Sequence, residues 1–287
     1  MSSSSFILSA MPLPMIVMYR RLRTVLAVDR RMRAALVGYL IPAVFIALLE
    51  SSSWTASLVP FNLLVTAKNS TANSTSSGEP TEPYLLSALS ISVPSCVFRF
   101  IGLLIISYVM ADPAQYKYSM QAFVLGTISG FALAQLANSG TSTYTKTFSA
   151  YLYIVANFHF SEFFVTGLMG SEMLKPDSFL LNHSKSYWTA LIVSWIEFLL
   201  ESFVPALHLP IISALGVVLC VAGELMRKLA MYYAASGFTH QIAVRRKKNH
   251  VLVTSGVYSL CRHPGYLGWM MWSIGTQVSH SKISRIP

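Results

Sequence analysis

The chain has 287 residues, of which 54% are hydrophobic and 11% charged, and its mean hydropathy is +0.54. A water-exposed surface cannot hold this composition, so it excludes a soluble globular protein and predicts an integral membrane protein. Lys and Arg outnumber Asp and Glu by 21 to 11, which gives a net charge of +10. The basic residues are clustered, which favours a role in membrane orientation over nucleic-acid binding.

Long apolar segments follow one another along the chain. A helix needs about 20 apolar residues to cross the ~30 Å hydrocarbon layer. The candidate spans, in chain order, are residues 34–50, 84–111, 119–138, 147–169, 187–206, 209–235 and 264–278. The last would make only about 22 Å of helix, which is too short to cross. The sequence therefore predicts an all-α fold: a polytopic helical membrane protein with about six full spans and an incomplete C-terminal hairpin.

The distribution of arginines predicts the orientation of these spans. Six arginines precede the first span: Arg20, Arg21, Arg23, Arg30, Arg31 and Arg33. The positive-inside rule places residues 1–33 in the cytosol as a basic N-terminal region. Residues 34–111 then hold the first two spans, with a lumenal Ser/Thr-rich insertion at 51–83 that carries glycosylation sequons at Asn69 and Asn73. Alternation of the later spans places residues 237–263 in the cytosol.

Several ionisable residues lie inside the predicted spans, at spacings that put them on one helix face. They form three sets: His159 with Glu162, Glu197 with Glu201, and Glu224 with Arg227 and Lys228. The last set is typical of an intrahelical ion pair near a cytosolic helix end. All three sets are consistent either with polar contacts between helices or with a polar passage or headgroup pocket. The three cysteines have neither paired nor metal-type spacing, so we expect reduced thiols and no metal site.

The stretch "HVLVTSGVYSLCRHPGYLGW", residues 250–269, interrupts the apolar pattern. Its triplet at 251–253 is expected to be extended and to end in a turn, which leaves backbone amides for a ligand. Pro264 is a typical first helical residue, and a helix N-terminus favours a carboxylate or phosphate. The run "RRKK" at 245–248 is consistent with binding an anionic ligand or anionic lipid. The pattern predicts an anion-bearing cofactor held at a membrane surface.

Several motifs occur together in one order: "FHFSEFFVT", "DSFLLNHS", "GELMRKLAMYYAASGF", "HVLVTSGVY", "RHPGYLGW" and "WSIGTQV". Over about 112–278 the chain resembles the protein-S-isoprenylcysteine O-methyltransferase, or isoprenylcysteine carboxyl methyltransferase, family. The resemblance implies a multi-pass enzyme of the endoplasmic reticulum membrane, with a methyltransferase-like core at 112–278 and a cofactor loop at 239–266 facing the cytosol. Its cofactor would be S-adenosyl-L-methionine. Its substrates would be prenylated CaaX-type proteins, methylated on the C-terminal farnesyl- or geranylgeranyl-cysteine.

The resemblance also implies a set of cofactor-binding residues. They correspond to His250, Val251, Leu252, Val253, Tyr258, His263, Pro264, Gly265 and Tyr266. The family's substrate-orienting Arg and a cofactor-contacting Glu would follow Val278, where this chain instead reads "SHSKISRIP". The expectation is therefore a C-terminally truncated member with a non-family tail at 279–287, unassigned catalytic residues and impaired activity. The alternative is a non-catalytic membrane protein that binds prenylated partners or the full-length enzyme.

Overall fold

The computed structural model of the chain describes residues 13–51, 101, 115–141, 143–170, 172, 174–182, 184–201, 206–207, 210–240, 251–280 and 283–284. Its helices are α2 (Leu13–Val28), α3 (Arg30–Ser51), α7 (Tyr116–Ala137), α8 (Thr143–Met169), α9 (Lys185–Glu201), α10 (Pro210–Ala234) and α11 (Pro264–His280). Three short 3₁₀ helices are η4 (Pro176–Phe179), η5 (Ala235–Gly237) and η6 (Gly256–Ser259). A two-residue antiparallel pair joins β1 (Ala206–Leu207) to β2 (Ile283–Ser284). Apart from that pair, the secondary structure in the described part is helical, which confirms the predicted fold class.

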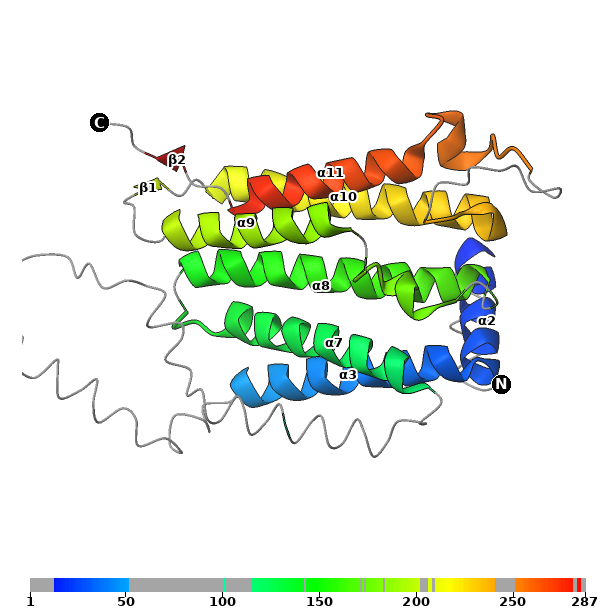
Figure 1. The fold of residues 1–287 in the computed structure, drawn as a ribbon, viewed down its shortest axis with the longest axis horizontal. Helices are drawn as coiled ribbons and strands as arrows, with labels where there is room; N and C mark the ends of the chain where they lie inside the picture. Colours follow the sequence, from blue (N-terminus) through cyan, green and yellow to red (C-terminus); the bar gives the residue numbers. More distant parts are fainter. Residues whose placement is uncertain are drawn as a thin grey trace, which may run out of the picture.

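Helices α3, α7 and α8 lie side by side and form one half of the molecule (Figure 1). In the described part of the chain, segments of three helices are long and apolar enough to cross a membrane: Arg30–Leu48, Tyr116–Ala137 and Thr143–Met169. Between α3, α8 and η4 lies a core of aromatic pairs, in which the rings of Tyr39 and Phe160 stack 3.8 Å apart and those of Phe163 and Phe179 stack 4.0 Å apart. These apolar helices make the chain a polytopic membrane protein.

Small residues allow α3 and α7 to approach closely. A Cβ atom added at Gly126 would lie 2.2 Å from the carbonyl oxygen of Tyr39, and one at Gly130 would lie 2.8 Å from that of Ala43. Van der Waals contact between backbones replaces side-chain packing at these points, as is common between membrane helices. The two helices are therefore held as a tight pair.

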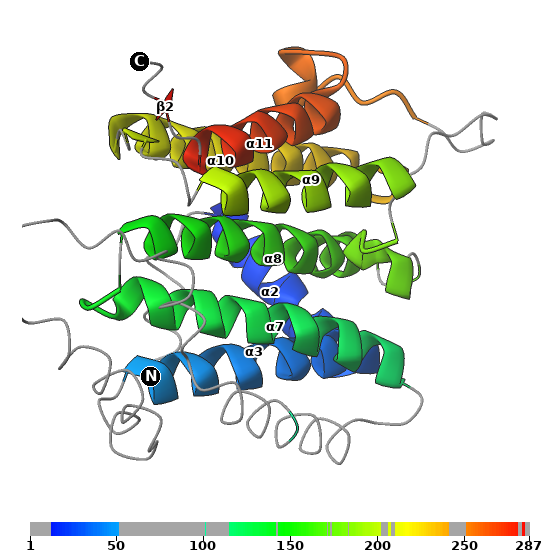
Figure 2. The ribbon, with the colours of Figure 1, turned by 60° about the vertical axis from the view of Figure 1, so that its left-hand side comes forward.

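The other half of the molecule contains a second tight pair, α10 and α11, which lie side by side in both views (Figures 1 and 2). Each helix contributes two glycines seven residues apart, Gly216 and Gly223 on α10 and Gly268 and Gly275 on α11. A Cβ added at any of the four would come within 2.3–2.7 Å of an atom of the opposite helix. We call these four residues the glycine seam. It fixes the position of α11, and hence of the loop before it.

Helix α9 packs through large side chains rather than through close backbone contact. The ring of Phe198 stacks on Tyr144 at 4.2 Å and on Phe148 at 4.5 Å, and the Tyr144 hydroxyl donates to the Phe198 carbonyl. The Ser194 hydroxyl donates to the side-chain oxygen of Gln277 on α11 at 3.3 Å. Stacked aromatic rings therefore connect the start of α8 to the end of α9.

Helix α2 runs across the end of the bundle, at a steep angle to the other helices (Figure 1). The sequence predicted only a basic region here, so this helix is a finding of the structure. Its residues Leu22, Val25 and Leu26 pack against the core. At its end Asp29 caps α3, since the carboxylate accepts the backbone N–H of Arg31 at 2.8 Å.

The predicted spans agree with the helices to within a few residues wherever both can be compared. The largest difference is at 187–206, where α9 ends at Glu201. Several predictions lie outside the described residues: the span 84–111 apart from residue 101, the lumenal insertion with Asn69 and Asn73, the basic run 245–248, and His250.

Candidate functional site

A cluster of charged side chains lies between α8 and α10. At its centre is the fully buried carboxylate of Glu162, on α8. Arg227, on α10, donates to both carboxylate oxygens, from Nε at 2.7 Å and from Nη2 at 2.8 Å. The Nζ of Lys228 lies 2.5 Å from Oε1, and Nδ1 of His240 lies 3.4 Å from Oε2. We call these four residues the charged cluster.

One further residue, Glu224, balances the positive charge of the charged cluster. Lys228 also contacts Glu224 of its own helix at 3.3 Å, and Glu224 accepts a hydrogen bond from Ser161 at 2.5 Å. The carboxylates of Glu162 and Glu224 balance the charges of Arg227 and Lys228. Because an unpaired buried charge is costly, the cluster is stable only as a set. The predicted intrahelical pair is confirmed for Lys228, whereas Arg227 pairs across to α8.

Arg227 extends the charged cluster to the start of α11. Its Nη1 donates to the carbonyl oxygen of Gly265 at 3.1 Å, and its guanidinium lies 5.7 Å from the ring centres of Phe158 and Phe238. A cation over an aromatic face is attracted by the ring quadrupole. One side chain therefore joins α8, α10 and α11 at the end of the bundle.

At this end lies a pocket of about 240 Å³. Its lining residues are Arg227, Gly237, Phe238, Thr239, His240, Tyr258, Arg262, His263, Gly265 and Tyr266. Rings and cations dominate, and no carboxylate lines the pocket among the residues that the structure describes. The site is therefore suited to a ligand that carries negative charge and a flat or cationic group.

The structure brings four of the nine sequence-predicted cofactor residues into this pocket: Tyr258, His263, Gly265 and Tyr266. Pro264, the first residue of α11, is fully buried and does not line the pocket. Val251 and Leu252 are 77% and 81% exposed and do not line the pocket, and Val253 is half-buried. His250 lies outside the described residues.

A glycine sets the course of the loop that carries Tyr258. Gly256 has φ of +60°, a left-handed conformation that L side chains rarely adopt. A Cβ there would lie 2.3 Å from the ring of Tyr233, so the loop rests directly on α10. Burial raises the pKa of the Tyr258 hydroxyl, and the adjacent Cys261 thiol adds to the rise. Tyr258 therefore presents a neutral hydroxyl at physiological pH.

The first turn of α11 has few free donors. Pro264 has no N–H, and the carbonyl of His263 accepts the N–H groups of Tyr266 at 3.1 Å and Leu267 at 3.0 Å. Because Gly265 sits between them at the pocket wall, its N–H is the first-turn donor that remains. Of the free N–H groups predicted at the start of α11, the one that remains is the amide of Gly265, near the cation Arg262.

His159 has a structural place outside the pocket. Its Nδ1 lies 2.9 Å from the carbonyl oxygen of Phe179, and its Nε2 lies 2.7 Å from the hydroxyl of Tyr187. A carbonyl can only accept, so Nδ1 carries the proton and Nε2 accepts from the tyrosine. His159 and Glu162, three residues apart, thus hold different helices to α8. Of the two roles that the sequence left open, the hydrogen bonds of both side chains support polar contact between helices.

Six lining residues are not among the nine predicted cofactor residues: Arg227, Gly237, Phe238, Thr239, His240 and Arg262. Thr239, His240 and Arg262 nevertheless fall within the predicted cofactor loop 239–266. For Arg227 a signal was present, because α10 carries two cations beside one Glu, while Glu162 has no cation within a helical turn of its own helix. An unbalanced charge on each of two spans indicates a pair between them. For Phe238, which follows the end of α10 and precedes the predicted loop, the sequence carries no comparable signal.

Together, these observations define a polytopic helical membrane protein with a pocket of rings and cations at the bundle end. Residues 215–286 match the sequence model of the Isoprenylcysteine carboxyl methyltransferase (ICMT) family, a range that includes α11 and most of α10. The protein-S-isoprenylcysteine O-methyltransferase of Saccharomyces cerevisiae is 33% identical over 171 residues, which are 57% of this chain and 70% of that protein. The chain belongs to this family.

Other relatives agree. The protein-S-isoprenylcysteine O-methyltransferases of Rattus norvegicus and Homo sapiens are 41% and 40% identical over 179 residues, 62% of this chain and 62% of each relative. The chain thus spans somewhat less than two thirds of the length of these mammalian relatives. The fold matches the solved structure of the eukaryotic intramembrane Ras methyltransferase ICMT with a TM-score of 0.68, 23% identity, and 88% and 80% of the two chains covered. That likeness supports the fold.

Proposed function

We propose that the chain is a methyltransferase that transfers a methyl group from S-adenosyl-L-methionine to the C-terminal carboxylate of prenylcysteine. The observation that carries the proposal is the pocket at the start of α11, where four predicted cofactor residues meet two arginines. Membership of the family supports a methyl donor and a prenylcysteine substrate. Its substrates are then prenylated CaaX-type proteins, and its place is the endoplasmic reticulum membrane with the pocket facing the cytosol.

The residues present fit this cofactor. S-adenosylmethionine carries a flat base, a sulfonium cation and a carboxylate. The rings of Phe238, Tyr258 and Tyr266 offer aromatic faces for the first two. Arg262 is exposed at the pocket, forms no ion pair with any other described residue, and offers a guanidinium for the third. Residues 250–253, which were also predicted to bind the cofactor, would add contacts beyond those of the described pocket lining.

The chain has little covalent chemistry to perform. When bound, S-adenosylmethionine supplies a sulfonium methyl group that a carboxylate oxygen attacks directly, so one C–O bond forms, one C–S bond breaks and no proton moves. A C-terminal carboxyl, with an ordinary pKa of about 3.5, is ionised at neutral pH, so no general base is needed. This agrees with a pocket lining in which the described residues include no carboxylate. The chain acts by positioning both groups and by excluding water.

Arg227 positions the pocket. Its hydrogen bonds to Glu162 and to the Gly265 carbonyl hold the first turn of α11 against α8 and α10. The prenyl tail would lie among the apolar helices α8 and α9, whose facing aromatic side chains include Phe148 and Phe198. A soluble methyl donor would thus meet a lipid-embedded substrate at the bundle end.

The test is transfer of labelled methyl from S-adenosylmethionine to N-acetyl-S-farnesylcysteine by membranes that contain the full chain. Tyr266→Ala, in the pocket, is expected to weaken donor binding by about tenfold, or ~1.4 kcal/mol, through the lost ring contact. Tyr116→Ala is the matched control, because Tyr116 is also an exposed tyrosine but lies outside the pocket. Equal activity of the two variants would remove Tyr266 from the site. Prenylcysteine binding with no methyl transfer would favour the non-catalytic alternative.

A further inference from the structure

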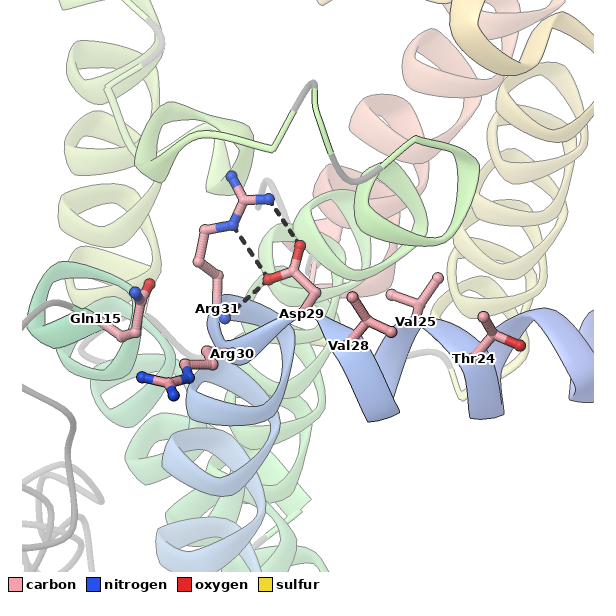
Figure 3. A pocket seen from close by; sticks show the side chains of 7 residues that line it. All are labelled: Thr24, Val25, Val28, Asp29, Arg30, Arg31 and Gln115. Carbon is pink, nitrogen blue, oxygen red and sulfur yellow. Dashed lines mark hydrogen bonds and ion pairs between the residues drawn. The ribbon is translucent and has the colours of Figure 1, made fainter.

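The corner between α2 and α3 holds the largest concentration of positive charge that the structure describes. Residues 20–33 contain six arginines and one acid, Asp29. A pocket of about 430 Å³ opens at this corner, lined by Thr24, Val25, Val28, Asp29, Arg30, Arg31 and Gln115 (Figure 3). It lies apart from the pocket at α11, with which it shares no residue.

Three of the six arginines are used inside the fold. Arg21 donates to the last carbonyl of α8, on Met169, at 2.5 Å. Arg33 donates to the carbonyls of Leu26 and Ala27 at the end of α2, at 2.8 and 2.6 Å. Arg31 binds the Asp29 carboxylate at 2.7 Å, as the dashed lines of Figure 3 show, and the Leu174 carbonyl at 3.0 Å. The one acid of the corner is thus neutralised by a neighbour.

The other three arginines, Arg20, Arg23 and Arg30, are exposed. Arg20 and Arg23 form no ion pair with any residue that the structure describes. By helical geometry, Arg20 lies on the side of α2 opposite Leu22, which packs on the core, and Arg23 lies on its flank. The outer side of α2 therefore presents the positive charges of Arg20 and Arg23.

The same helix exposes apolar side chains. Met15 is 51% exposed, Val17 50%, Met18 41%, Tyr19 41% and Val28 77%. Figure 3 shows α2 leaving the corner at a steep angle to α3, a span, so α2 lies across the bundle end rather than along it. A helix that carries exposed arginines and exposed apolar residues together has the composition of a helix that binds at a membrane surface.

We propose that the α2–α3 corner docks the headgroup of an anionic phospholipid, with Arg20 and Arg23 facing the phosphate and the apolar residues of α2 facing the acyl chains. Charge complementarity selects the anionic lipid, because the corner carries a net charge of five from six arginines and one acid. The position of α2 selects the membrane over a soluble ligand. The site is independent of the methyl-transfer pocket and stands whether or not that function is correct.

The test is native mass spectrometry of the full chain in an uncharged detergent, titrated with phosphatidylglycerol or with phosphatidylcholine of the same acyl chains. Each basic residue near a lipid surface contributes about 1 kcal/mol, or roughly fivefold in affinity. We expect phosphatidylglycerol to bind the wild type at least tenfold more tightly. Arg20→Gln together with Arg23→Gln should remove that preference.

Two controls test whether the preference for phosphatidylglycerol comes from the α2–α3 corner and whether it requires the acyl chains. Lys146 lies near the start of α8, whereas the α2–α3 corner contacts the end of that helix at Met169. Lys146→Gln removes one positive charge, as Arg23→Gln does from α2, and should leave the lipid preference unchanged. Glycerol phosphate at millimolar concentration should not displace the lipid, since it lacks acyl chains. Equal binding of the two lipids by the wild type, an unchanged preference in the double variant, or displacement by glycerol phosphate would each overturn the proposal. So would an equal loss of preference in Lys146→Gln.

Discussion

The two tight helix pairs, α3–α7 and α10–α11, are built in the same way but do different things. In each pair, glycines bring two backbones together, at Gly126 and Gly130 in the first and along the glycine seam in the second. Between α3, α7 and α8 lie uncharged contacts, such as those of the Tyr39 hydroxyl with Ser129 and Asn157, while the Asp29–Arg31 ion pair lies at the start of α3. Beside the second lies the charged cluster. Close backbone packing therefore holds both pairs together, and the charged side chains beside α10–α11 form part of the candidate site.

The charged cluster links packing to function through one residue. Arg227 is on α10, pairs with the carboxylate of Glu162 on α8, and reaches the first turn of α11. Because its donors are fixed by buried acceptors, its direction is set by the fold rather than by solvent. The difference between the two halves can be tested by breaking each in matched ways.

The largest expected effect is on Glu162. Glu162→Gln leaves Arg227 and Lys228 without their shared buried carboxylate, which should lower the free energy of unfolding by about 3–5 kcal/mol. Thermal denaturation in detergent, followed by size-exclusion chromatography, measures the change. Glu224→Gln is the control, because its side chain is 28% exposed and contacts Lys228 alone among the cations; it should cost about 1 kcal/mol. Equal midpoints for the two variants would contradict a central role for Glu162.

Next in size is a pair of glycine substitutions. A Cβ at Gly223 would lie 2.6 Å from the Gly268 carbonyl, and one at Gly130 would lie 2.8 Å from the Ala43 carbonyl. Gly223→Ala and Gly130→Ala should each lower stability by about 1–3 kcal/mol, since the helices must separate. Only Gly223→Ala should also weaken methyl-donor binding, because it shifts α11 away from Arg227. Donor binding by titration, measured well below both denaturation midpoints, separates the two effects. A similar loss in Gly130→Ala would mean that the pocket responds to stability in general.

The sequence predicts the two halves unequally well. Apolar length locates α3, α7, α8 and α10 to within a few residues, because the membrane sets the length of a span. The pocket residues Tyr258, His263, Gly265 and Tyr266 are also predicted, since they form one local motif. The partner of Arg227 is not, because Glu162 is 65 residues away and only packing brings the two together. Helix α2 is missed because its arginines break the apolar pattern and indicate orientation rather than structure.

A smaller effect is expected at the uncharged contacts between α3, α7 and α8. The Tyr39 hydroxyl donates to the side-chain oxygen of Asn157 at 2.9 Å and lies 2.8 Å from the Ser129 hydroxyl. Tyr39→Phe should lower the free energy of unfolding by about 1 kcal/mol and leave donor binding unchanged. A double-mutant cycle with Ser129→Ala isolates the Tyr39–Ser129 contact. Strict additivity of the two variants would show that this hydrogen bond contributes nothing, and a change in donor binding would undo the separation of the two halves.

The smallest expected effect is at Asp29, the cap of α3. Burial by itself would raise the pKa of Asp29, but its hydrogen bonds to Arg31 and the charge of that residue outweigh burial and hold the pKa below its ordinary value of 3.8. The folded state thus favours the ionised carboxylate, which contributes stability that is fully present above that value and is lost as the pH falls through the lowered pKa. Asp29→Asn keeps a capping side chain and removes the ion pair, so at neutral pH it should cost below about 1 kcal/mol. Denaturation midpoints of the two proteins should differ at about pH 6 and approach each other as the pH falls below the ordinary pKa of 3.8. A difference that persists undiminished in acid would mean that Asp29 acts through its shape rather than its charge, and that the charge of this corner rests on the arginines alone.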